Sequence, residues 1–124
     1  MHTLRSALLP ALALLVLTAA CSSSDAEDEE LLAARQEKYC RQLGVWQKAR
    51  DAARTTEAES SGYDEVEGLA QIALFTVRPL RDESLGEGRT LGETTARAMN
   101  NGDSAAEGRV VEYCADAGFE TLTR

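Results

Sequence analysis

Residues 29–56, EELLAARQEKYCRQLGVWQKARDAARTT, carry the pattern on which the fold depends. Apolar side chains recur there at spacings of three and four residues, with mostly charged or polar side chains between them. This period places the apolar side chains on one side of an α-helix, since 3.6 residues complete a turn. The segment therefore predicts a long helix with one buried stripe. The stripe comprises Leu32, Tyr39, Cys40, Leu43, Trp46, Ala49 and Ala53.

A second helix is predicted after a break at residues 60–62, Ser-Ser-Gly. Asp64 is placed to cap its start, with Glu67 three residues on as the capping-box partner. Residues 72–77 taken alone fit a buried strand as well, but the chain offers no second strand to pair with it, so a helix ending before Pro79 is favoured. Its stripe comprises Val66, Leu69, Ala70, Ala73 and Val77, widened by Ile72 and Phe75.

Two shorter helices are predicted beyond a polar, glycine-containing loop at residues 82–88. Thr90 with Glu93, and Ser104 with Glu107, have the spacing of capping boxes. Asn-Gly at residues 101–102 ends the third helix, and Gly118 ends the fourth. The inward positions are Leu91, Thr95, Ala98 and Met99 on the third helix, and Val110, Val111, Cys114 and Ala117 on the fourth, with Phe119 and Leu122 folding back onto the helices.

Four helices joined by short loops, with no convincing strand, predict an all-α fold. We expect a small four-helix bundle, of the up-and-down kind, over residues 29–124. The preceding segment, residues 21–28, is rich in serine and acidic residues and predicts a flexible spacer.

Residues 1–20 have the layout of a secretory signal. Arg5 gives a positive start, residues 6–17 are almost wholly apolar, and the small residues Thr18, Ala19 and Ala20 follow. The apolar run is shorter than the roughly 20 residues that span a bilayer. We therefore expect cleavage rather than a retained span.

Leu17-Thr18-Ala19-Ala20-Cys21 resembles the lipobox of bacterial lipoproteins, in which small residues precede a lipidated cysteine. The resemblance covers only the first 21 residues. It implies a diacylglycerol on Cys21 and anchorage at the extracytoplasmic face of the cell membrane. Thr18 departs from the larger aliphatic residue favoured at its position, which leaves secretion after the same cleavage as the alternative.

The chain has three cysteines, Cys21, Cys40 and Cys114. Lipidation of Cys21 would leave an even pair outside the cytoplasm, where a disulfide persists. Cys40 and Cys114 lie on the apolar stripes of the first and last predicted helices. We therefore expect a Cys40–Cys114 disulfide, with two buried free thiols as the alternative.

Composition excludes several function classes. Without residues 1–20 the chain keeps 12 basic and all 21 acidic residues, a net charge of −9, which disfavours nucleic acid. His2, the only histidine, is lost with the signal, and this removes Ser-His and Cys-His pairs and the commonest metal ligand. No calcium loop or phosphate loop is present. The sequence therefore predicts no catalytic residues, metal or cofactor.

Trp46 is the residue singled out for binding, because interfaces are enriched in tryptophan. Its spacing from Leu43 and Ala49 favours a core position. We expect a non-catalytic, lipid-anchored module that contacts an envelope protein. The alternatives are a lipoprotein that holds an apolar or small molecule in a pocket lined by Leu69, Ile72 and Phe75, and, ranked last, a hydrolase using two carboxylates.

Overall fold

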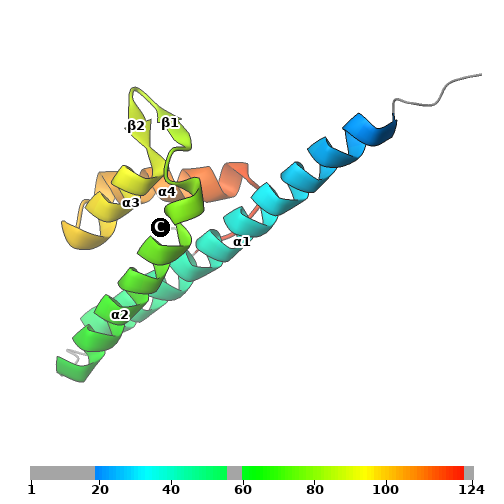
Figure 1. Ribbon diagram of the computed structural model, residues 1–124. Helices are drawn as coiled ribbons and strands as arrows, with labels where there is room; N and C mark the ends of the chain where they lie inside the picture. Colours follow the sequence, from blue (N-terminus) through cyan, green and yellow to red (C-terminus); the bar gives the residue numbers. More distant parts are fainter. Residues whose placement is uncertain (1–18, 56–59, 122–124) are drawn as a thin grey trace, which may run out of the picture.

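The computed structural model describes residues 19–55 and 60–121, and the side chains of residues 25–55 and 62–121. The predicted signal, apart from its last two residues, and Leu122 lie outside the described residues. The elements are α1 (Ala19–Thr55), α2 (Ser60–Thr76), the 3-10 helix η1 (Arg78–Leu80), β1 (Ser84–Gly86), β2 (Arg89–Thr90), α3 (Leu91–Asn100) and α4 (Ser104–Asp116) (Figure 1). The prediction of a mostly helical domain with four helices is confirmed.

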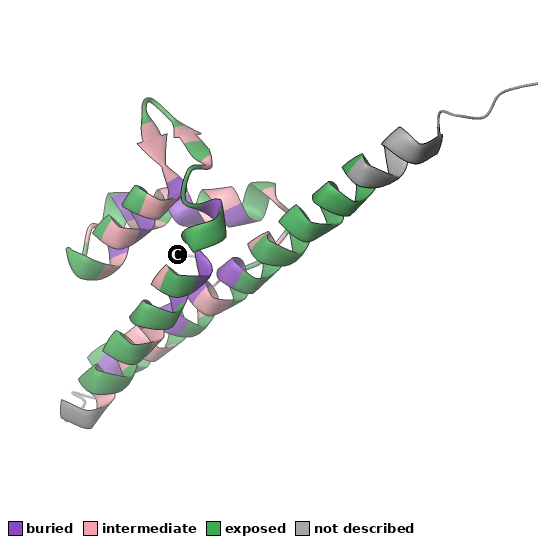
Figure 2. Ribbon diagram, viewed as in Figure 1, coloured by how far each residue is buried: buried purple, intermediate pink, exposed green. Residues whose placement is uncertain are grey.

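Helix α1 is longer than the sequence predicts, because it includes residues 21–28, where a flexible spacer was expected. These residues contain no glycine or proline, and their alanines and glutamates are good helix formers. At about 1.5 Å per residue the 37-residue helix is roughly 55 Å long. Its N-terminal half projects beyond the other helices as an arm, and residues 25–38 of this arm are mostly exposed (Figures 1 and 2). Leu32, expected in the buried stripe, is therefore exposed.

Helix α2 begins at Ser60, four residues before the predicted cap at Asp64. The expected break at residues 60–62 is instead its first turn. Packing against α1 offsets the cost of about 1 kcal/mol for Gly62. The choice of helix over strand for residues 72–77 is confirmed as far as Thr76, where α2 ends. Pro79 lies within η1.

Two predicted core residues of α2 face solvent instead. Ile72 is 48% and Phe75 is 62% exposed, whereas Ala70, Ala73 and Val77 are buried. The reason is tertiary, because α3 and α4 cover only one side of the α1–α2 hairpin (Figure 2). The apolar stripe of α2 is thus wide enough to pack against neighbours on two sides, but only one side of it is buried.

The predicted loop at residues 82–88 contains a short antiparallel β-hairpin, in which Ser84 pairs with Thr90 and Gly86 with Arg89. The backbone at Gly86, Glu87 and Gly88 has positive φ angles of 86°, 55° and 75°. Positive φ at both central residues is the geometry of the tight hairpin turn, and glycine adopts it without steric cost. The prediction that the chain has no strand is therefore wrong at this point.

Of the two caps predicted for α3 and α4, the cap of α3 forms as expected, whereas the cap of α4 lies one residue earlier. The Thr90 hydroxyl accepts from the backbone N–H of Glu93 at 3.3 Å, as the sequence predicts. At α4 the cap is Asp103 rather than Ser104, since the Asp103 carboxylate accepts from the Ala106 N–H at 3.1 Å. The carboxylate one residue earlier has the better geometry for the same role.

The core forms where the two helical hairpins meet. Figure 1 shows that α4 runs across α1 rather than along it, so the helices do not form a simple up-and-down bundle. The predicted Cys40–Cys114 disulfide is present, with a Cα–Cα distance of 5.8 Å, and joins α1 to α4. Phe119 packs back on the core as expected. The buried cluster comprises Tyr39, Cys40, Leu43, Trp46, Ala70, Val77, Leu80, Leu91, Val110 and Cys114.

Candidate functional site

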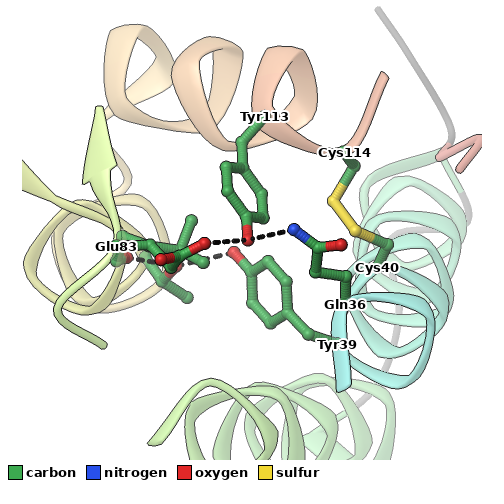
Figure 3. Close-up of a disulfide and its surroundings, with 8 residues drawn as sticks. Gln36, Tyr39, Cys40, Glu83, Tyr113 and Cys114 are labelled. Carbon is green, nitrogen blue, oxygen red and sulfur yellow. Dashed lines mark hydrogen bonds between the residues drawn. A yellow bond between two sulfur atoms is a disulfide. The ribbon is translucent and has the colours of Figure 1, made fainter. Parts of the chain in front are cut away.

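A partly buried polar network surrounds the disulfide (Figure 3). Gln36 Nε2 donates to the Tyr113 hydroxyl at 2.9 Å, and that hydroxyl donates to Glu83 Oε1 at 3.2 Å. The hydroxyl of Tyr39 lies 2.6 Å from Thr95 Oγ1. The network thereby ties α1 to α3, α4 and the segment before the β-hairpin.

The two tyrosines of this network remain protonated. Burial raises the pKa of Tyr39 far above its ordinary value. Burial also raises the pKa of Tyr113, and the neighbouring Glu83 carboxylate adds to the effect. Since Thr95 donates its own proton to the Leu91 carbonyl at 2.7 Å, Tyr39 must be the donor to Thr95. Both phenols are hydrogen-bond donors here, which makes them structural groups rather than nucleophiles.

Trp46 is only 3% exposed and belongs to the core cluster, as its spacing predicts. The Arg50 guanidinium lies over its ring, 4.6 Å from the centroid, at a distance typical of a cation–π contact. The same side chain lines an open cleft between α1, α2 and the turn joining α3 to α4. Trp46 is therefore a core residue that also lines a cleft, and its role in binding stays a prediction.

This cleft, which we call the Trp46 cleft, has a volume of about 480 Å³. Volumes between about 300 and 1,000 Å³ are typical of small-molecule sites. Its apolar wall comprises Trp46, Val66, Ala70, Leu74 and Met99, and its polar rim includes Arg50, Arg54, Tyr63, Glu67, Ser104 and Glu107. The pocket expected at Leu69, Ile72 and Phe75 does not form there: Leu69 lines a different, shallower hollow, and the other two face solvent.

Glu107 lies at one end of the cleft in an ion pair with Arg50 that joins α4 to α1. Arg50 Nη2 donates to Glu107 Oε2 at 3.0 Å, and Gln47 Nε2 donates to the same oxygen at 2.7 Å. Burial opposes ionisation of Glu107, but the hydrogen bonds from Arg50 and Gln47 outweigh it, so the pKa of Glu107 is lowered. The pKa of Arg50 is raised, since its bonds to Glu107 and Asp51 outweigh the opposing effect of burial. The pair is thus fully charged at neutral pH.

The lowered pKa of Glu107 predicts a pH-dependent contribution to stability. A carboxyl whose pKa is lower in the folded than in the unfolded chain stabilises above its unfolded value, here about 4.5, and loses that effect as pH falls through the folded value. We expect Glu107→Gln to lower the free energy of unfolding by about 1 kcal/mol at pH 7, and by less as the pH falls below about 4.5. Urea unfolding across this pH range measures both.

Glu112→Gln is the matched control, because it removes the same charge from an exposed position on α4. It should leave the free energy of unfolding at pH 7 within about 0.5 kcal/mol of the parent. Equal losses for the two variants would show that the effect comes from net charge and not from the ion pair.

The arginines of the cleft were not among the residues predicted to bind. Trp46, Arg50 and Arg54 are four residues apart and so share one face of α1. This spacing was a readable signal, but only the position of α4 shows that Glu107 neutralises Arg50 and that Arg54 lies at the rim. Glu67 and Glu107 line the same cleft, and the pairing of Glu107 with Arg50 removes it as a proton donor.

No protein family, curated protein or solved structure matches this chain. Among the described residues, no three His, Cys, Asp or Glu side chains are grouped so that they could hold a metal ion. No helix in that part of the chain combines the length and apolar character needed to cross a membrane. The side chain of Cys21, the predicted lipidation site in the first turns of α1, lies outside the described side chains.

Proposed function

We propose that this chain is a lipid-anchored protein of the bacterial cell envelope that binds another envelope protein without catalysing a reaction. The observation that carries the proposal is an apolar surface on the outer side of the α1–α2 hairpin. Phe75 is 62%, Ile72 is 48% and Val45 is 40% exposed there. We call Val45, Leu69, Ile72 and Phe75 the hairpin face.

The members of the hairpin face are neighbours. Val45 and Leu69 line one hollow of about 390 Å³ between α1 and α2. Ile72 and Phe75 follow Leu69 at three-residue steps, which keeps them on adjoining parts of the helix surface. Single exposed apolar residues are ordinary, whereas a contiguous group with an aromatic residue is typical of interfaces. The guanidinium of Arg78 in η1 lies over the Phe75 ring, 5.2 Å from its centroid, but Phe75 remains 62% exposed.

The borders of the hairpin face indicate the chemistry of the partner. Lys48 on α1 and Glu65 on α2 line the same hollow as Val45 and Leu69. An apolar centre bordered by both signs of charge fits a partner with an apolar helix or ridge flanked by charged side chains. It is a poor match for an anionic lipid surface, given the acidic composition of the chain.

The length of α1 supports anchorage through Cys21. About 15 residues of helix separate Cys21 from Gln36, where contacts with α4 begin, so the arm would hold the body roughly 22 Å from the membrane. That spacing leaves the hairpin face accessible to a neighbouring protein. The disulfide is consistent with an extracytoplasmic site, because such bonds persist there.

The test uses the native chain with a photoreactive phenylalanine analogue at position 75, and in separate strains at positions 45 and 72. Membranes are irradiated, the protein is purified, and intact masses are measured. We expect one adduct mass shared by all three positions, and an unreacted protein that begins at an acylated Cys21.

Lys38 on α1 and Glu112 on α4 are exposed positions outside the hairpin face, and the analogue placed there should give no such adduct. Adducts at every position, or an adduct with twice the chain's own mass, would contradict a specific envelope partner. An unmodified Cys21 on released protein would contradict the anchor and leave secretion as the destination.

A second candidate function is the binding of a small molecule, and the Trp46 cleft is the observation that favours it. The cleft combines an apolar wall with a polar rim, which is the composition of most ligand sites. It lies on the side of α2 that faces the α3–α4 turn, away from the hairpin face. The two functions can therefore coexist and be tested separately.

A further inference from the structure

We infer that the Trp46 cleft binds a small apolar molecule that carries one carboxylate, and that Arg54 recognises the charge. The inference rests on the ligand-binding function proposed above and is independent of the hairpin face. It follows from three features of the described residues: the apolar wall, the charges already neutralised around it, and the one cation at the rim that has no ion-pair partner among them.

The apolar wall sets the size and character of the body of the ligand. Trp46, Val66 and Leu74 line the cleft together with Ala70 and Met99, from three different helices. A volume of about 480 Å³ accommodates a molecule of on the order of 10–20 non-hydrogen atoms. Burying an apolar group of this size against the wall provides most of the binding free energy.

The charges at the rim are only partly neutralised. Arg50 and Glu107 pair with each other, and Arg50 also contacts Asp51. Arg54 lines both the cleft and a smaller adjoining hollow of about 250 Å³, and forms no ion pair with any described residue. Its guanidinium has the planar fork that binds a carboxylate through two hydrogen bonds.

The cleft is less suited to a cation. An amine bound in an apolar site beside tryptophan would use a face of the indole ring, and the Arg50 guanidinium already occupies one of the two faces, 4.6 Å from the centroid. Glu67 is the one acid at the rim besides Glu107, and it is exposed on α2. Arg54 and Glu67 are both exposed, and neither forms an ion pair with a described residue. The planar fork of Arg54 is the feature that favours an anion, and Glu67 defines the opposite outcome that the experiment distinguishes.

Trp46 allows a direct test, because it is the only tryptophan in the chain. The protein purified from membranes is reconstituted in phosphatidylcholine vesicles, and protein-free vesicles serve as the blank. The fluorescence of Trp46 is titrated with 4-phenylbutanoate, 4-phenylbutan-1-ol and 4-phenylbutylamine, which share one apolar body and differ in charge. We expect saturable binding with the carboxylate about tenfold tighter than the alcohol, and the amine weakest.

Three variants separate the contribution of the Arg54 charge to binding from that of the apolar wall. Arg54→Gln should weaken the carboxylate about tenfold and leave the alcohol unchanged. Leu74→Ala should weaken both ligands by about threefold to tenfold, because both use the apolar wall. Arg41→Gln is the matched control: it removes the same charge from an exposed position on α1 that lines none of the described cavities, and it should change neither affinity.

The outcomes distinguish the inference from the function on which it rests. If none of the three compounds gives saturable binding above the blank, ligand binding itself fails. If the alcohol binds as tightly as the carboxylate, or Arg41→Gln acts like Arg54→Gln, the cleft is a binding site but recognition by Arg54 is overturned. If the amine binds tightest and Glu67→Gln abolishes its advantage, the charge assignment is reversed.

Discussion

The double variant Cys40→Ala/Cys114→Ala is expected to lose about 4 kcal/mol of unfolding free energy, the largest effect of any change considered. The disulfide closes a loop with a sequence separation of 74 residues, and a cross-link over so long a segment strongly restricts the unfolded chain. The total free energy of unfolding of a small domain is only about 5–15 kcal/mol. Alanine is chosen over serine because both cysteines are fully buried, and a serine hydroxyl would be buried there without a hydrogen-bond partner.

Urea unfolding, followed through Trp46 fluorescence, measures the loss. Trp46 is buried on α1 beside Arg50, so separation of α4 from α1 should change its emission. Reduction of the unaltered protein with a thiol reagent should give a similar loss without any change of sequence. A loss below about 1 kcal/mol in both experiments would mean that the ion pair and the tyrosine network hold α4 to α1 unaided.

Gly92→Ala is expected to destabilise the protein by about 2–3 kcal/mol, although alanine is the better helix former. Gly92 lies in the first turn of α3, and its N–H donates to the Arg81 carbonyl at 3.0 Å. A Cβ at this position would lie 2.8 Å from Arg81 Cβ and 3.1 Å from its Cα. The clash is with the backbone that follows η1, so rotation of a side chain cannot relieve it.

Gly68→Ala in α2 and Gly108→Ala in α4 are the matched controls, because a Cβ at either position would meet nothing within 4 Å. Each should stabilise the protein by about 0.5–1 kcal/mol through the loss of backbone freedom in the unfolded chain. Thermal unfolding of the three variants should therefore give shifts of opposite sign. A stabilising Gly92→Ala would contradict the close packing of α3 on Arg81.

Much of the local structure could be predicted from short-range patterns. The Thr90 cap, the end of α3 at residues 101–102 and the helical state of residues 72–76 depend on neighbours within about four positions. The pairing of Cys40 with Cys114 could also be predicted, because each lies on the buried stripe of its own helix. Such features are settled by backbone sterics, capping and hydrophobic periodicity.

The candidate sites were harder to predict from the sequence. Trp46 was correctly placed in the core, but its role in the cleft depends on Arg50, Glu107 and the α3–α4 turn, which lie far apart in the chain. Ile72 and Phe75 have the same apolar character as the buried residues of α2 and cannot be told from them by periodicity. Even the β-hairpin at Gly86 and Gly88 was obscured by its short strands.

Local sequence thus determined which segments are helical, which sides of them are apolar and which two cysteines can meet. Only the tertiary structure decided that α3 and α4 cover one side of the α1–α2 hairpin, leaving Phe75 in solvent, and that α1 continues outward as an arm. The physical reason is that an apolar stripe depends on local sequence and indicates only that burial is favourable. Which element buries the stripe depends on packing between segments that are distant in the chain.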